Sequence, residues 1–375
     1  MTAVRALVAD RVRIPFRRPF PTATGMWLER DTWLIRVVDD DGRVGLGEAC
    51  LEPDAADVAE TILVALIREA AETATEGRLP LEAYLEVHGA PGRALNAALE
   101  SARFDLAGFG APGGAAVDEG VGVNATIPSL GTTAAAEAAL QSVESGFMTL
   151  KLKAGAERET DVLVDRLRAI RAAIGPEVRL RLDVNGAWDL TTAEDRLEAV
   201  ARFDLEYCEQ PLSGHDIDGL AELRRRVRVP IAADEAAESV RAVRALLDAD
   251  AVDALVVKPA RVGGLAAVAE IAELAAGRGV RVVISTLFET GVGIAAALAA
   301  AAALPDPPAD ADADWPPDHG LATAGLLDHD LLLGSLVVEG GRMHAPGDPD
   351  SGGLGVKLDT RALDRYRVES VGSLP

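Results

Sequence analysis

From about residue 120 onward, two kinds of segment alternate along the chain. A short run of β-branched and other apolar residues ends in a polar residue, and an alanine-rich segment with helical periodicity follows it. The short runs are FMTLKLK, VRLRLDVNG, LEYCEQP, VPIAADE, ALVVKPA and RVVISTLFE. Strands that alternate with helices predict a parallel sheet whose neighbouring strands are joined by helical crossovers.

The polar residues at the ends of these runs recur at a nearly constant spacing. The six residues are Lys153, Asp183, Glu209, Asp234, Lys258 and Ser285. They are separated by 30, 26, 25, 24 and 27 residues, which is about what one strand, one helix and two connections require. Six or more such units favour a (β/α) barrel over an open sheet. In a barrel, residues at the carboxyl ends of the strands meet at one mouth.

The N-terminal part of the chain follows a different pattern. The stretch TWLIRVVDDDGRVGLGEAC predicts a β-hairpin with its turn at DDDG, and helical patterns follow over residues 54–74 and 92–108. We therefore predict an α+β capping domain at residues 1–115 and a barrel at 116–332. We expect the tail, 333–375, which contains the strand-like run GSLVVEGGRMHAPG, to return to the cap.

The amino-acid composition limits the classes of binding partner that we expect. The chain has 375 residues, is 49% hydrophobic and carries a formal net charge of −23. Such a charge disfavours binding to nucleic acid or to an anionic membrane surface. The N-terminus lacks the pattern of a signal peptide, and no apolar tract reaches the roughly 20 residues that span a bilayer. We expect a cytoplasmic protein; the sequence leaves open whether it forms a homo-oligomer.

Lysine is rare in this chain, and three of the four lysines lie in the repeated strand-like runs. Of 37 basic residues, only Lys151, Lys153, Lys258 and Lys357 are lysine. On a strand, Lys151 and Lys153 would point to the same face. A partly desolvated lysine beside another cation has a lowered pKa and can act as a neutral base, whereas arginine cannot release its proton. The alternative is an exposed edge strand protected by lysine, which the apolar flanking residues disfavour.

Three carboxylates lie between these lysines in the repeat. Asp183, Glu209 and Asp234 end three consecutive predicted strands, where they would repel one another unless a cation lay between them. Oxygen ligands favour a hard cation, so we predict a Mg²⁺ site that also accepts Mn²⁺. A bound Mg²⁺ with a lysine on either side suits removal of a proton next to a carboxylate. The alternative is that the acids are ordinary helix caps.

Five of these motifs, taken in order, resemble a known family. The segments LKLKAG, LRLDVNGAW, EYCEQPL, IAADE and VVKPARVGG are similar to those of the enolase superfamily, in its muconate-lactonizing-enzyme subgroup. The resemblance implies a modified (β/α)₇β TIM-type barrel with a cap, and Mg²⁺ on the three carboxylates. It also implies that Lys153 is the acid/base, Lys151 its electrostatic partner and Lys258 the lysine of the opposite face.

The resemblance also suggests a reaction. The run STLFETGVG and the predicted eighth strand, HGLATAGLL, most resemble the o-succinylbenzoate synthases of menaquinone biosynthesis. This implies a hydro-lyase acting on a small carboxylate, in which Lys153 removes the α-proton and later protonates the leaving hydroxyl. The alternative is an N-succinylamino-acid racemase or another racemase or epimerase of the subgroup. Dipeptide epimerases typically carry Asp-x-Asp at the end of strand 8, where this chain reads GLATAG.

Further residues are candidates for contact with substrate. Ser285 and Thr286 would bind the substrate carboxylate, or else pack at a strand end. Gly25 and Met26 belong to PFPTATGMW, which is either a loop covering the barrel mouth or a hairpin connection.

Two polar residues and one glycine pair have alternative interpretations. Asn185 either supports the metal site or serves as a turn residue. Glu235 either supports the far lysine or begins a helix. Gly291 and Gly293 either belong to a phosphate-binding helix start or permit a tight turn, and the turn is the commoner case.

Overall fold

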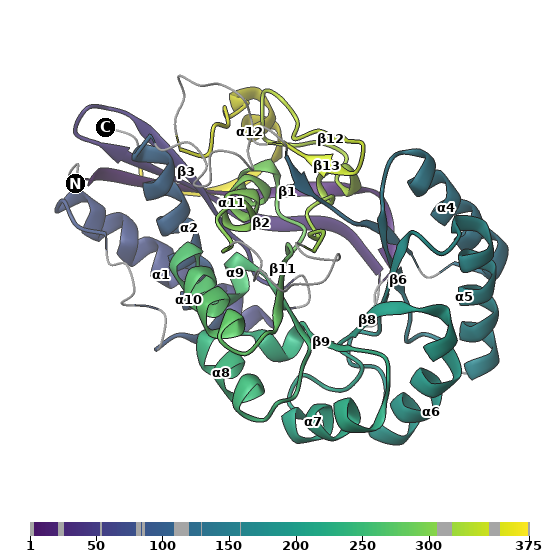
Figure 1. Cartoon of the computed structure of the whole chain (residues 1–375). Helices are drawn as coiled ribbons and strands as arrows, with labels where there is room; N and C mark the ends of the chain where they lie inside the picture. The colour runs from purple at the N-terminus through teal and green to yellow at the C-terminus, as the bar shows by residue number, and fades with distance from the viewer. Residues whose placement is uncertain are drawn as a thin grey trace.

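The computed structural model describes residues 4–21, 26–52, 55–79, 84, 87–108, 120–128, 130–157, 159–305, 317–344 and 353–373. Figure 1 shows helices α4 to α8 in an arc around the short strands of a curled sheet, with the long strands β1 and β2 lying across its open side. The chain therefore has an α/β fold that includes an N-terminal β-rich part.

All strands of the curled sheet run parallel, in the order β11-β10-β9-β8-β7-β6-β5. Their bounds are Ala125–Ile127 (β5), Thr149–Lys153 (β6), Arg179–Asp183 (β7), Leu205–Glu209 (β8), Ile231–Ala233 (β9), Ala254–Val257 (β10) and Arg281–Ile284 (β11). Each of the six short runs contains one of the strands β6 to β11, so this prediction is confirmed. Their apolar residues are buried on both faces, as in parallel sheets generally.

Helices follow these strands in the predicted alternation. They are α4 (Thr132–Glu144), α5 (Thr160–Ile174), α6 (Leu190–Val200), α7 (Ile217–Arg226), α8 (Val240–Asp248), α9 (Pro259–Val262), α10 (Leu265–Ala276) and α11 (Gly291–Ala302). Short 3₁₀ turns occur at Ala201–Phe203 (η1), Glu235–Ala237 (η2) and Ala324–Leu326 (η3). Several helix starts are capped by side chains: Asp216 and Ser239 accept bonds from the backbone amides of Gly219 and Ala242.

A two-residue segment lies between the edges of the curled sheet. His319 forms a parallel bridge with Val123, and Gly320 forms one with Ser285. The amide of Gly320 donates to the Ile284 carbonyl at 2.8 Å. The predicted eighth strand is thus reduced to these bridges, because the chain turns into η3 a few residues later. The complete (β/α)₇β closure stays a prediction.

The N-terminal sheet is antiparallel, in the order β14-β1-β2-β3. Its strands are β1 (Val4–Pro21), β2 (Met26–Asp39), β3 (Val44–Ala49) and β14 (Arg367–Val371). Strands β2 and β3 form the predicted hairpin, and helices α1 (Asp57–Thr75) and α2 (Gly89–Leu106) pack against the sheet. Gly45 and Gly47 face the carbonyl oxygens of Ala102 and Ala98 so closely that a Cβ would overlap them. Glycine therefore lets β3 approach α2.

The C-terminal tail returns to the N-terminal sheet through its last strand. After α12 (Thr360–Tyr366), β14 pairs with β1. The predicted strand-like run instead gives β12 (Val338–Glu339) and β13 (Arg342–Met343), and β13 pairs with β4 (Val121–Gly122) near the start of the curled sheet. The division into residues 1–115, 116–332 and 333–375 stays a prediction.

Two large hydrophobic cores stabilise the curled-sheet part and the N-terminal part. One fills the space between the curled sheet and its helices, and the other lies between the N-terminal sheet and helices α1 and α2. Inside the curled sheet the fully buried Arg181 pairs with Glu206 at 2.6 Å and lies over the Tyr207 ring. Among the described helices, none is long and apolar enough to cross a membrane.

Candidate active site

The three predicted acids lie at one end of neighbouring parallel strands. Asp183 ends β7 and pairs in register with Glu209, which ends β8, while Asp234 follows β9 directly. All three residues are buried, with exposed fractions of 0%, 1% and 2% in this order. The strand spacing therefore brings the acids together, as the sequence predicted.

The three lysines point at these acids from two sides. The Lys151 Nζ lies 3.0 Å from Asp183 Oδ2 and 3.0 Å from Glu209 Oε1. The Lys153 Nζ lies 2.7 Å from the same Asp183 oxygen. From the other side of the row, the Lys258 Nζ lies 2.7 Å from Asp234 Oδ2. Their functional roles stay a proposal, but the structure places all six side chains in one cluster.

Asn185 and Glu235 connect the two sides of this cluster. The Asn185 Oδ1 accepts a bond from Lys153 Nζ at 3.0 Å, and its Nδ2 donates to Glu235 Oε1 at 3.1 Å. Asn185 also has a left-handed backbone, with φ of +50°, as its interpretation as a turn residue expects, while its support of a metal site stays a proposal. Glu235 begins η2, and its second oxygen, Oε2, is buried without a hydrogen-bond partner among the described residues. Such an orphaned acceptor is a place where a further donor or cation would be stabilised.

Two residues of the cluster were missed from the sequence. Arg261 donates from Nη1 to Asp234 Oδ1 at 2.5 Å and from Nε to Glu52 Oε1 at 2.6 Å. The Gln210 Oε1 accepts the backbone amides of Asp234 at 2.9 Å and Ala236 at 3.0 Å. The usable sequence signal for Arg261 is its position three residues after Lys258.

Burial and the neighbouring charges shift the pKa values of the three acids in different directions. Burial alone would raise the pKa of Asp183, but Lys153 and Lys151 outweigh it and the pKa is lowered. For Asp234, Arg261 and Lys258 likewise overcome burial and lower the pKa to about 2. Burial and the nearby Asp183 raise the pKa of Glu209 to about 7 despite Lys151. Of the three acids, Glu209 therefore has the negative charge that the nearby cations stabilise least.

Lys151 departs from the behaviour expected of paired lysines. We expected two neighbouring lysines to lower each other's pKa. Burial does lower the pKa of Lys151, but Glu209 and Asp183 outweigh it and raise the pKa well above its ordinary value. Glu209 and Asp183 therefore favour the charged form of Lys151.

The donor set fits a hard divalent cation, although the side chains as they stand do not form a metal cage. Within the described ranges, no group of three acid, histidine or cysteine side chains is arranged to hold a metal ion. The Lys151 ammonium lies 3.0 Å from both Asp183 and Glu209, so oxygens of these two acids can reach one cation. Three buried carboxylates that offer only oxygen are the ligands that Mg²⁺ prefers.

The structure describes some, but not all, of the residues that we expect to contact the substrate. Val257 pairs in register with Ile284, so Lys258 and Ser285 follow at one level of the sheet. Ser285 and Thr286 are buried; their hydroxyls contact the Gly320 carbonyl at 3.4 Å and the Thr323 hydroxyl at 2.9 Å. Met26 is 57% exposed at the start of β2, and Gly25 lies outside the described residues. Their contact with substrate stays a prediction.

The start of α11 is already occupied by two acids. Glu48 accepts the amides of Thr290 and Gly293, each at 3.0 Å, and Asp330 accepts the amide of Gly291 at 2.7 Å. An anion at this helix start would need these donors. The phosphate interpretation of Gly291 and Gly293 therefore loses its support.

Glu289 is a second buried acid beside Glu48. It is 3% exposed, and the Leu287 amide donates to its carboxylate. Burial and the nearby Glu48 raise the pKa of Glu289 to about 7. Between about pH 4.5 and 7 the folded protein therefore holds a proton there that the unfolded chain releases, so this group makes stability fall as pH rises.

We expect Glu289→Gln to reduce this pH dependence. From pH 5 to 7, the unfolding free energy of the unmodified protein should fall by about 2 kcal/mol more than that of the variant. Buried His319, with its pKa lowered to about 4, makes stability rise as pH rises. Because both proteins contain His319, it does not affect the difference between them. Urea unfolding at the two pH values measures the difference, and identical pH dependence in the two proteins would contradict it.

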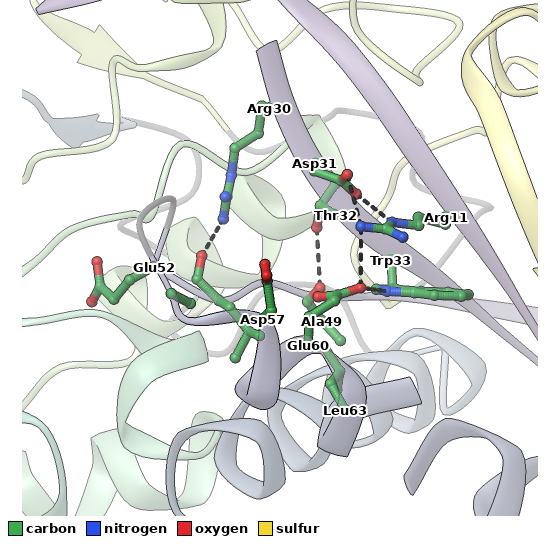
Figure 2. Close-up of a pocket in the computed structure, with 12 residues that line it drawn as sticks. Arg11, Arg30, Asp31, Thr32, Trp33, Ala49, Glu52, Asp57, Glu60 and Leu63 are labelled. Atoms are coloured by element: carbon green, nitrogen blue, oxygen red, sulfur yellow. Dashed lines mark hydrogen bonds and ion pairs between the residues drawn. The ribbon is translucent and has the colours of Figure 1, made fainter. Parts of the chain in front are cut away.

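A separate polar cavity of about 170 Å³ lies in the N-terminal part, between strands β1 to β3 and helix α1. Figure 2 shows that its polar side chains pair largely with one another. Arg11 contacts Asp31 at 2.7 Å, and the Trp33 ring nitrogen donates to Glu60 at 2.9 Å. The lining also includes Glu52, whose carboxylate contacts Arg261 of the acid cluster.

Comparison with known proteins identifies the family. The family described as Enolase C-terminal domain-like matches residues 134–362. The chain belongs to the enolase superfamily. The recognition made from the five sequence motifs is thereby confirmed.

Individual superfamily relatives have related but different activities. An o-succinylbenzoate synthase from Thermobifida fusca is 42% identical over 52% of this chain, although the match spans only 58% of that relative. An N-succinylamino acid racemase from Amycolatopsis is 32% identical over 76% of this chain and 78% of its own length. Muconate lactonizing enzyme from Pseudomonas fluorescens, solved with muconolactone, has a TM-score of 0.82 at 25% identity, covering 98% of this chain and 99% of its own.

Proposed function

We propose that this superfamily member is a Mg²⁺-dependent hydro-lyase of the o-succinylbenzoate synthase kind, built on a closed (β/α)₇β barrel. It would remove a proton next to a carboxylate and eliminate water. The observation that carries the proposal is the approach of Lys153 and Lys258 to one row of buried acids from its two sides. The Thermobifida relative supports the choice of reaction.

Asp183, Glu209 and Asp234 would hold the metal ion. When bound, Mg²⁺ supplies the positive charge that stabilises the negative charge developing on the substrate carboxylate. Arg261 and Gln210 fix Asp234, one through its side chain and the other through its backbone amide. Such supporting contacts keep metal ligands oriented.

Lys153 would carry both proton transfers. Its neutral Nζ takes the α-proton, and the electrons of the broken C–H bond pass toward the carboxylate. The C–O bond to the neighbouring hydroxyl then breaks, and Lys153 returns the same proton so that water leaves. Asp183 and Asn185 orient the amine through bonds of 2.7 and 3.0 Å.

Lys258 would remain protonated in this reaction. It lies on the far side of the acid row, beside Asp234, and would add positive charge near the developing anion. Lys151 would be the electrostatic partner of Lys153, since its Nζ lies 3.0 Å from both Asp183 and Glu209.

The second candidate is N-succinylamino-acid racemisation. It is favoured by the placement of Lys258, which faces the same row as Lys153 but from the other side. Racemisation needs one acid/base on each face of the α-carbon. The Amycolatopsis relative supports this alternative.

The proposal is tested by offering both substrates with Mg²⁺. We expect the cyclohexadiene carboxylate substrate to lose water, seen as a change in ultraviolet absorbance when its ring becomes aromatic. An N-succinylamino acid in deuterated water reports racemisation by loss of the α-proton signal. α-Exchange from both enantiomers without dehydration would favour the racemase, and no reaction with either substrate would overturn both assignments.

Lys258→Ala distinguishes the two mechanisms further. A lyase that uses Lys153 alone should retain dehydration at a reduced rate, because the proton-transfer group is intact. A racemase should lose α-exchange from one enantiomer by about 10²-fold or more while exchange from the other enantiomer persists. Nuclear magnetic resonance on each pure enantiomer gives the answer.

A further inference from the structure

The connection between β11 and α11, residues Ser285–Thr290, is held in place from the N-terminal sheet. This segment includes Ser285 and Thr286, the predicted substrate contacts. We propose that Glu48 is a positioning residue for this segment and thereby sets the affinity for substrate. The inference rests on the proposed function, since it concerns substrate binding at that same site.

Glu48 makes a dense set of contacts with the start of α11. It is 5% exposed and lies next to the last residue of β3. Its carboxylate accepts the Thr290 amide at 3.0 and 3.1 Å, the Thr290 hydroxyl at 2.6 Å and the Gly293 amide at 3.0 Å. A negative charge at a helix start is further stabilised by the helix dipole. One side chain of the N-terminal sheet thus satisfies three donors of the curled-sheet part.

The middle of the segment has a second anchor. Phe288 has a φ of +64°, a strained conformation for a bulky residue. Its ring packs edge-on against Phe16, Phe20 and Trp27 of strands β1 and β2, with centroid separations of 6.0, 5.0 and 5.8 Å. Because a strained backbone persists only where its surroundings fix it, these rings hold the segment in its present shape.

Packing leaves the segment little room to adjust. A Cβ at Gly293 would lie 2.5 Å from the Glu289 Cβ and 3.2 Å from Glu48 Oε2. With glutamine in place of Glu48, one acceptor oxygen becomes an NH₂ donor, so buried donors of Thr290 and Gly293 would lose an acceptor, which is costly. The segment would then shift toward other acceptors and carry Ser285 and Thr286 with it.

Loss of the Glu48 carboxylate should affect substrate binding and not proton transfer. Lys153 and the acid row belong to strands β6 to β9, which Glu48 does not contact by any hydrogen bond described for it. Loss of Glu48 therefore moves the substrate contacts and leaves the proton-transfer group in place. This predicts a change in KM with little change in kcat.

The test compares Glu48→Gln with the matched control Asp105→Asn. Asp105 is also an acid that accepts backbone amides, those of Leu46 in β3 and Leu354 in the tail, each at 2.9 Å, but it makes no such contact with the segment. With saturating Mg²⁺, we expect Glu48→Gln to raise KM about tenfold and to change kcat less than about threefold. Asp105→Asn should lower Tm without raising KM.

Hydrogen–deuterium exchange keeps this test separate from the proposed function. Amides from Leu287 to Gly293 should exchange at least about tenfold faster in Glu48→Gln than in Asp105→Asn. If the unmodified protein acts on neither substrate, the proposed function fails, and this exchange comparison alone then decides the positioning role. An unchanged KM in an active Glu48→Gln variant, or equal exchange in the two variants, would overturn it.

Discussion

Replacing Lys153 with arginine is expected to lower kcat by about 10³-fold or more while leaving the fold intact. Arginine keeps a positive charge beside Asp183, which accepts from Lys153 at 2.7 Å, so the ion pair survives. What the variant loses is a side chain that can give up its proton, since a guanidinium does not release its proton in proteins. Steady-state kinetics together with a thermal melt measure the two effects separately.

Lys357→Arg serves as the matched control for this substitution. Lys357 is exposed in the C-terminal tail, and the same chemical change there should leave both kcat and Tm essentially unchanged. If Lys153→Arg kept more than about a tenth of the normal turnover, Lys153 could not be the proton-transfer group.

The second large effect is a contrast between two acids of the row. We expect Asp183→Asn to lower the unfolding free energy by about 3 kcal/mol, because two partly buried ammonium groups, those of Lys151 and Lys153, lose a shared partner. Glu209→Gln should cost less than Asp183→Asn, because burial and the nearby Asp183 already raise the pKa of Glu209 and so weaken the preference for its charged form. Both variants should lose turnover by about 10²-fold or more, since each lacks a ligand proposed for the metal.

Urea unfolding in the presence of a chelator, with turnover measured separately, tests this contrast. Glu206→Gln is the control on the same strand, β8: it removes the partner of Arg181, so it should lower stability yet retain turnover. Equal destabilisation by the Asp183 and Glu209 variants would contradict the charge assignment. Normal turnover in Glu209→Gln would contradict its role as a ligand.

The acid and lysine row could be predicted because its signals are local. Each member except Lys151, which lies two residues before Lys153 on the same strand, ends or directly follows a short apolar run, and parallel strands in register place such residues side by side. The register of Lys153 with Asp183, and of Asp183 with Glu209, follows from this rule. The spacing of the runs was therefore enough to find these positions.

Contacts between distant segments could not be predicted in this way. Glu48 and Thr290 are separated by 242 residues, and neither has a sequence pattern that indicates the other. Arg261 contacts Glu52, 209 residues away, for the same reason. The raised pKa of Lys151 depends on its side chain reaching both Glu209 and Asp183, and that is a matter of side-chain packing, which strand periodicity does not encode.

The tail shows a further limit of pattern-based prediction. Its strand-like run pairs with β4, whereas β14 makes the return to the N-terminal sheet. Short strands carry too little alternation to specify a partner, because register depends on which face the rest of the fold buries. The eighth strand is reduced to two bridges for a comparable reason, since GLATAG contains no sustained apolar run.

Calorimetric titration with Mg²⁺ tests most directly whether Asp183, Glu209 and Asp234 share a divalent ion between the two lysine faces. For the intact chain at pH 7.5, the account predicts binding of one ion per chain and a marked loss of affinity in Glu209→Gln. No binding by the intact chain, or the same affinity in both proteins, would contradict it.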